Sequence, residues 1–98
     1  MTTEQRNTIE KIVREYIKSN ERYVRDINNE DDLEHVIHTA IDILAAKWGL
    51  LDYYGSFVEA ITKNNLTDTF ACADETNLKA IQFYVMIKYN VGCPRSLR

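Results

Sequence analysis

The residues best suited to chemistry are two histidines and two aspartates that recur at helical spacing. Asp31, His35, His38 and Asp42 are separated by four, three and four residues, which places their side chains on one helix face. Imidazole and carboxylate groups together suit Zn²⁺ or Fe²⁺. Helical bundles build such sites from several inward-facing helices, and no second set of ligands is evident. We expect a solvated polar face and no cofactor, with a metal site at His35, His38 and Asp42 or a pH-sensitive contact as alternatives.

A second candidate is a row of cations spaced three or four residues apart: Lys11, Arg14, Lys18, Arg22 and Arg25. Alone, such a row is typical of a face that binds phosphates or an acidic membrane surface. Acids flank it, and Glu10–Arg14 and Glu21–Arg25 stand four apart in the order that favours ion pairing. We therefore expect a self-paired solvent face. The alternative is docking onto an acidic surface, such as residues 30–34 of a second subunit.

The negative charge of the chain is concentrated in its middle. Residues 30–66 hold two Lys/Arg against seven Asp/Glu, whereas the segments on either side each carry a net charge of +1. Glu30, Asp31 and Asp32 stand at a predicted helix start, where acids complement the helix dipole. Capping accounts for this cluster, and a basic protein partner is the alternative. Duplex nucleic acid is a poor partner, because binding it requires clustered cations.

Aromatic residues surround two glycines near the middle of the chain, and they comprise Trp48, Tyr53, Tyr54 and Phe57. Most are expected to fill the core, although aromatics beside glycines also suit a ligand pocket. Tyr53 lies off the apolar stripe and is predicted to be an exposed contact residue. Lys47 lies on that stripe, so its ammonium group must reach solvent or an acid.

The motifs typical of enzymes are missing. Nucleophile elbows, P-loops, dinucleotide fingerprints and Cys/His pairs at metal spacing do not occur, so we expect no catalytic residues and no enzyme activity. The two cysteines, Cys72 and Cys93, lie far apart in the chain. They are expected to be free thiols, with a disulfide or a metal role as alternatives.

Apolar periodicity predicts the helices that position these residues. From Ile9 to Ile27 the large apolar residues fall in one arc, which predicts a helix over residues 3–28 that Ser19-Asn20 interrupts or ends early. A second stripe runs from Leu33 to Ile61 and stays in phase through both glycines. One long helix kinked near Gly49 is slightly favoured over two helices that meet there.

The last third of the chain predicts a short helical turn and a final helix. Thr67–Thr69 can cap a turn that reaches Ala73, and Asp74 or Thr76 can cap a helix that ends near Asn90. Residues 81–91 also alternate with the period of a strand, which would need a second subunit as its neighbour. We favour a helix that is apolar on most sides, and we predict an oligomer interface at Phe83, Tyr84, Ile87 and Val91.

These patterns together predict an all-α protein, a bundle of three to four long amphipathic helices that forms a homodimer or a larger oligomer. The chain of 98 residues, with 45% hydrophobic residues, three Gly and one Pro, fits one helical domain over residues 1–92 and a short flexible tail over 93–98. Its start is polar and charged, and no apolar run approaches the roughly 20 residues that span a bilayer. We expect no membrane association and a cytoplasmic location.

The function that fits these expectations is a small non-enzymatic module that binds another protein as an inhibitor or accessory regulator. Compact acidic helical proteins of this kind are often inhibitors or accessory factors, including those that phages and other mobile elements encode, so such an origin is an expectation here. The alternatives are an oligomeric protein that binds or sequesters a small ligand or nucleotide, and a metal-binding helical protein that uses His35 and His38. The predicted partner-binding residues are Tyr53, the five cations Lys11, Arg14, Lys18, Arg22 and Arg25, and the acids Glu30, Asp31 and Asp32.

Overall fold

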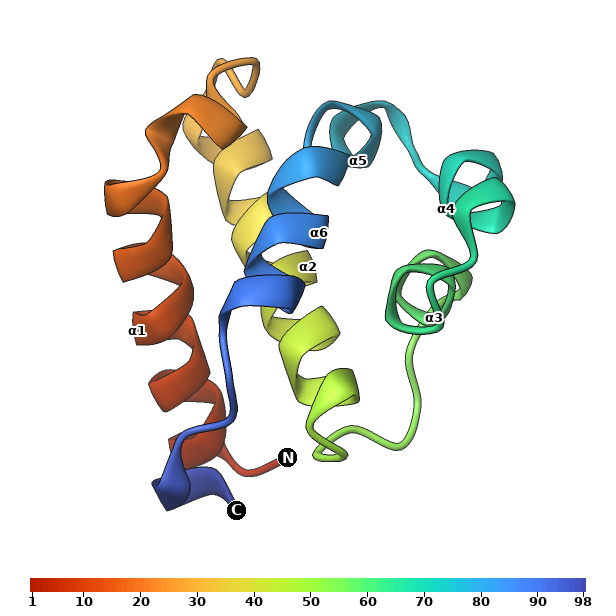
Figure 1. Ribbon diagram of the computed structural model, residues 1–98. Helices are drawn as coiled ribbons and strands as arrows, with labels where there is room; N and C mark the ends of the chain where they lie inside the picture. Colours follow the sequence, from red (N-terminus) through yellow and green to blue (C-terminus); the bar gives the residue numbers. More distant parts are fainter.

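The computed structural model describes residues 1–98, and it is helical throughout, without strands (Figure 1). The prediction of an all-α protein is confirmed, and so is the preference for a helix over a strand in residues 81–91. Six α-helices replace the three or four that periodicity predicts. In chain order they are α1 (Thr3–Ser19), α2 (Glu30–Lys47), α3 (Ser56–Thr62), α4 (Leu66–Cys72), α5 (Glu75–Lys79) and α6 (Ile81–Asn90), with 3₁₀ turns η1 (Glu21–Val24) and η2 (Arg95–Leu97).

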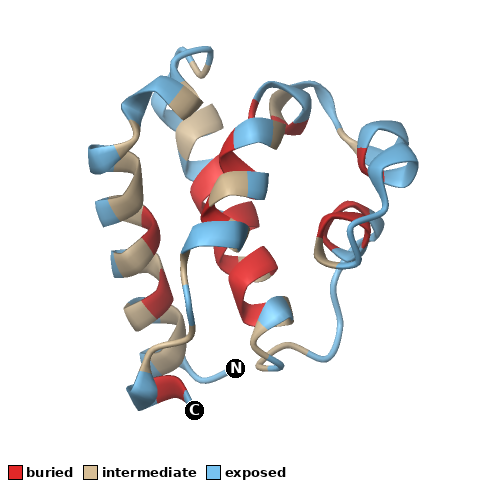
Figure 2. Ribbon diagram, in the orientation of Figure 1, coloured by how far each residue is buried: buried red, intermediate tan, exposed pale blue.

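Helix α2 is the centre of the molecule and packs against α1, α3 and α6. It is buried around most of its circumference (Figure 2), and Ile37, Ile41 and Leu44 are almost completely inaccessible to solvent. Ile9 and Val13 from α1 complete one side of this core. The apolar stripe that begins at Leu33 therefore predicts the core residues of α2 correctly, because helical periodicity reports which side chains share a face.

Helix α1 ends at Ser19, so the prediction of a helix reaching residue 28 is wrong. The interruption noted at Ser19-Asn20 is the physical reason. The Asn20 side chain donates to the Tyr16 carbonyl oxygen at 2.9 Å, and its backbone N–H donates to the Ile17 carbonyl. The chain continues as the short turn η1, which still places Tyr23 and Val24 against the core.

Gly49 separates α2 from α3, so the favoured single kinked helix is also wrong. Gly49 adopts a left-handed conformation with φ of +74°, which ends a helix and which other residues adopt only at a cost. An extended segment then leads to α3, which begins after Gly55. The start of α2 agrees with expectation, because the Asn29 side chain accepts a hydrogen bond from the Asp32 N–H at 2.8 Å.

Helices α3 and α4 pack against each other as a pair, here called the α3–α4 hairpin, at one side of the molecule (Figure 1). Asn64, with φ of +59°, reverses the chain between them. The side chain of Asn65, rather than Thr67, caps α4 by accepting from the Asp68 N–H at 3.0 Å. Phe57, Val58 and other residues of α3 enter the core, whereas Thr69 is the one buried residue of α4.

The predicted last helix is divided at Ala80 into α5 and α6. Asp74 caps α5, as expected, by accepting from the Asn77 N–H at 2.7 Å. Phe83, Tyr84 and Ile87 are completely buried inside a single chain, and Val91 is half-buried. The prediction of an oligomer interface is therefore wrong for Phe83, Tyr84 and Ile87, because α2, α3 and α1 of the same chain already cover that side of α6. At Val91 the interface stays a prediction.

The last residues, 93–98, pack against the rest of the chain. They form the turn η2, in which Leu97 is buried and belongs to the core, and the Arg98 side chain donates to the Cys93 carbonyl. The turn lies near the N-terminal end of α1 (Figure 1). Across the whole molecule, no helix has the length and apolar character needed to cross a membrane.

Candidate functional site

An apolar surface that remains partly exposed lies between the α3–α4 hairpin and α6. Two hollows meet there and share Ile61, Asn64 and Val85, so they form one continuous groove. We call it the α4–α6 groove. Its lining residues are Lys47, Ile61, Asn64, Leu66, Thr69, Ile81, Val85, Lys88 and Tyr89.

One wall of the groove is a row of side chains on α6. Ile81, Val85 and Tyr89 are spaced four residues apart and therefore share one face of the helix. Val85 is 47% exposed and Tyr89 is 82% exposed, although the same helix also carries the completely buried Phe83, Tyr84 and Ile87. Helix α6 is thus apolar on two sides, one facing the core and one facing the groove, which explains why its sequence resembles an alternating strand.

The opposite wall comes from α4, whose large apolar side chains are exposed to solvent. Leu66 and Phe70 are one turn apart and are 71% and 51% exposed, while Thr69 between them is buried. Figure 2 shows α4 almost entirely in the colour of exposed residues. Leu78 of α5 is also about half exposed.

Two lysines form one end of the groove. The Lys47 ammonium donates to the carbonyl oxygens of Lys88 and Val91, and the Lys88 ammonium donates to the Ile61 and Thr62 carbonyls and to Asn64 Oδ1 at 2.7–3.0 Å. Each lysine therefore caps the C-terminal end of a neighbouring helix. Burial lowers the pKa of Lys88, and the nearby charge of Lys47 lowers it further. Neither ammonium lies within ion-pair distance of a carboxylate.

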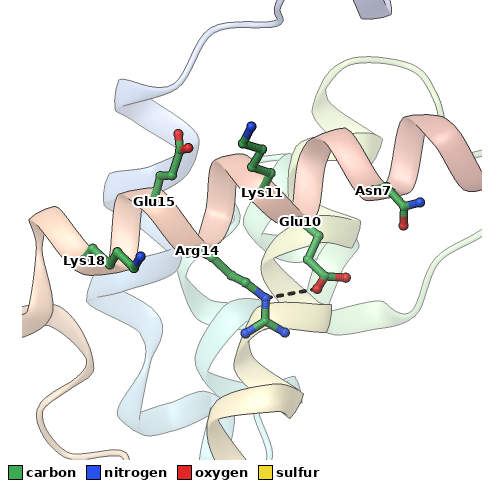
Figure 3. A pocket seen from close by; sticks show the side chains of 6 residues that line it. All are labelled: Asn7, Glu10, Lys11, Arg14, Glu15 and Lys18. Atoms are coloured by element: carbon green, nitrogen blue, oxygen red, sulfur yellow. Dashed lines mark hydrogen bonds and ion pairs between the residues drawn. The ribbon is translucent and has the colours of Figure 1, made fainter.

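The cationic row on α1 is only partly self-paired. Glu10 and Arg14 form the expected ion pair at 3.0 Å, and Arg14 also reaches Glu34 of α2 at 3.0 Å. These two hydrogen bonds raise the pKa of Arg14, with Glu34 as the larger cause. Figure 3 shows Glu10 and Arg14 joined on one side of α1 and Lys11 on the other. The hollow drawn there has no apolar lining and belongs to one helix alone.

The distal part of that row departs from expectation. The predicted Glu21–Arg25 ion pair does not form within 4.0 Å, because the helix has already ended at Ser19 and the four-residue spacing no longer aligns the two side chains. The Arg22 guanidinium lies 4.9 Å from the Tyr23 ring centroid instead and donates to its hydroxyl. Lys11, Lys18 and Arg25 are exposed.

The metal candidates on α2 have separate partners rather than a common centre. His35 Nε2 lies 3.2 Å from Asp74, His38 Nε2 lies 3.9 Å from Glu34, and Asp42 lies 3.8 Å from Arg6. No group of three His, Cys, Asp or Glu side chains converges on one point. Burial raises the pKa of Asp42, and the charges of Arg6 and His38 oppose that shift. The spacing did place the groups on one face, but their partners lie on other elements.

The remaining predicted site residues are dispersed. Tyr53 is 92% exposed, in the segment between α2 and α3, while Phe57 is buried with its ring centroid 5.6 Å from that of Tyr84. Glu30 and Asp31 are exposed beside the Asn29 cap. The cysteines are free thiols, as predicted, with Cys72 exposed and Cys93 half-buried.

The α4–α6 groove was not among the predicted sites. One signal was Leu66, a large apolar residue in a segment predicted only as a short turn. A second signal was the apolar character of two sides of α6. The predicted subunit interface used the side that is buried in the core, whereas the groove uses the other side. Periodicity identified the apolar residues, but it did not reveal which of them the rest of the chain would cover.

Comparisons of the chain with protein families, with curated proteins and with solved structures find no match. Function therefore has to be argued from the geometry of the groove and its surroundings.

Proposed function

We propose that the protein binds another protein through the α4–α6 groove and acts as an inhibitor or accessory regulator of that partner. The observation that carries the proposal is the exposure of Leu66, Val85 and Tyr89, which line the groove from α4 and α6. Contiguous apolar surface rimmed by polar residues is typical of interaction sites on proteins of this size. Aromatic residues such as Tyr89 are also the side chains that contribute most at protein interfaces.

A protein partner fits the groove better than a small ligand. Small-molecule sites enclose most of the ligand surface, whereas here Leu66 and Tyr89, which line the groove, are more than half exposed. The groove offers contact area, two ammonium groups and one amide, which supports a binding role over a catalytic one.

The test is affinity capture from the source organism with three forms of the chain: wild type, Val85→Glu and the control Gln82→Glu. Gln82 is exposed on the same helix but does not line the groove. We expect wild type and Gln82→Glu to retain the same partner and Val85→Glu to lose it, with all three unfolding at similar temperatures. A partner retained equally by Val85→Glu would contradict the proposal.

Self-association is the competing use of the same surface. Sedimentation analysis of the purified chain separates the two uses, because a self-associating groove would give a dimer that Val85→Glu dissociates. A dimer of that kind would replace the proposed heterologous partner.

A further inference from the structure

We infer that the partner segment is an amphipathic helix whose apolar row fills the α4–α6 groove and whose carboxylate side chains lie at the end formed by Lys47 and Lys88. This inference rests on the proposed function and specifies the chemistry of the partner.

The shape of the groove favours a helix as its occupant. One wall is the helical row Ile81–Val85–Tyr89 on α6, and Leu66 and Thr69 of α4 and Ile61 of α3 line the rest. The ten residues of α6 extend about 15 Å, which matches a partner helix of about three turns. The chain has no strand, and therefore no sheet edge to which an extended segment could add.

The charge of the groove is uneven along its length. Both lysines stand at one end, and the groove has no acidic lining residue. The next lysine along the chain, Lys63, is already paired with Glu59 at 2.6 Å. Lys47 and Lys88 instead donate to neutral carbonyl and amide oxygens, so no carboxylate of the same chain neutralises them.

The helix ends beneath the lysines do not remove this preference. The C-terminal ends of α3 and α6 carry partial negative charge, equivalent to roughly half a charge each, against two full ammonium charges. Those ends are also occupied, because the lysines already bond their last carbonyls. A partner that covers this end without an acid would bury two cations with no counter-ion, which is unfavourable. The partner must therefore supply both apolar side chains along the groove and a carboxylate at the end formed by the two lysines.

The test is selection from a displayed library of helical peptides about fifteen residues long, with the surface positions randomised. Wild type, Val85→Glu and Gln82→Glu are the targets. We expect wild type and Gln82→Glu to enrich peptides with apolar residues at i, i+4 and i+7 and with Asp or Glu at one end. Val85→Glu is expected to lose these peptides.

Changes on the peptide then measure each requirement without altering the fold of the protein. Replacing the terminal Glu of a selected peptide by Gln should weaken binding about fivefold at low salt, and the difference should shrink at high salt. Replacing its central Leu by Ala should weaken binding by tenfold or more. In the variant Lys47→Met, the difference between the Glu and Gln peptides should become smaller, because only the Lys88 ammonium remains at that end.

The outcomes distinguish the two claims. Enriched peptides that need Val85 but show no acidic end, or no loss on Glu→Gln, would overturn the inference and leave the proposed function in place. Enriched peptides without helical spacing would also overturn the inference. A selection that yields no peptide dependent on Val85 would contradict the proposed function itself.

Discussion

Two regions of the molecule use similar apolar residues in different ways. One is the half built from α1, α2 and α6, and the other is the α3–α4 hairpin. In the first half, Ile9, Ile41 and Phe83 are completely buried. In the hairpin, α3 contributes buried residues to the core, but α4 leaves Leu66 and Phe70 in solvent. Figure 2 shows this contrast between the centre and the outer helix of the hairpin.

The difference indicates which apolar residues stabilise the fold and which remain for binding. Complete burial of a Leu, Ile or Phe side chain stabilises the folded state by about 1.5–3 kcal/mol. Leu66 and Phe70 obtain only part of that gain within the chain, so their apolar surface remains available to a partner. The buried half should therefore be sensitive to truncation of side chains, and the exposed apolar residues Leu66 and Tyr89 of the groove should not.

The largest effect is expected from a matched pair of truncations. Ile41→Ala, in the core of α2, should lower the free energy of unfolding by about 3–4 kcal/mol, because it removes buried contacts and leaves a cavity. Leu66→Ala should change it by less than about 0.5 kcal/mol. Urea unfolding measures both values. If Leu66→Ala lowered the free energy of unfolding as much as Ile41→Ala, Leu66 would stabilise the fold rather than remain available for binding.

The next effect concerns the lysine that joins the two regions. Lys88→Met removes the bonds from α6 to the last carbonyls of α3, and we expect it to destabilise the chain by about 2 kcal/mol. Amide hydrogen exchange should become faster in the hairpin than in α2. The control is Lys79→Met, at an exposed lysine of α5. Equal acceleration in α2 and α3 would contradict a local role for Lys88.

A smaller effect separates two tyrosines of the same helix. The buried Tyr84 hydroxyl donates to Asn77 Oδ1 at 2.6 Å and joins α6 to α5. Tyr84→Phe should therefore cost about 1–2 kcal/mol, because the Asn77 carbonyl loses its buried donor. Tyr89→Phe, in the groove, should leave stability unchanged, as thermal unfolding would show. A similar loss from both variants would remove the distinction between the two sides of α6.

The smallest effect is pH-dependent and lies at the edge of the buried half. Burial raises the pKa of Asp42, so ionisation of this carboxyl disfavours the folded state as pH rises through that pKa. Asp42→Asn should therefore stabilise the chain at pH 7 by about a few tenths of a kcal/mol, since the site is partly exposed. The gain should disappear below the ordinary pKa of 3.8.

Thermal unfolding at several pH values tests this, with Asp52→Asn at an exposed loop position as the control. A stabilisation that persisted unchanged at pH 3 would show that the substitution acts through packing rather than through the charge of Asp42.

The sequence predicted the helical class and much of the core. The stripe from Leu33 to Ile61 contains many of the residues that pack in the core, since periodicity depends only on local geometry. The breaks were harder to predict. A glycine such as Gly49 can occur within a helix, and the sequence alone does not show that its φ is left-handed. Asn20 ends α1 because its side chain forms a hydrogen bond that competes with those of the helix.

The site was the least predictable part. The Glu10–Arg14 pair follows from spacing along one helix, but the partners of His35 and Arg14 lie on other elements. The α4–α6 groove forms because the turn at Asn64 places α4 so that it and α6 line the same hollow. This is a tertiary arrangement, which local sequence patterns do not report. The residues of the groove were visible in the sequence, whereas their exposure was not.

The most direct test of the groove as a binding surface is site-specific photo-crosslinking in cells of the source organism. A benzophenone amino acid replaces Val85 in one variant, Gln82 in a second and Lys18 on α1 in a third. The groove predicts an adduct with one heterologous protein from position 85 and little from positions 82 and 18. Adducts with that protein from position 18 but not from position 85 would contradict it and assign binding to the cationic row of α1.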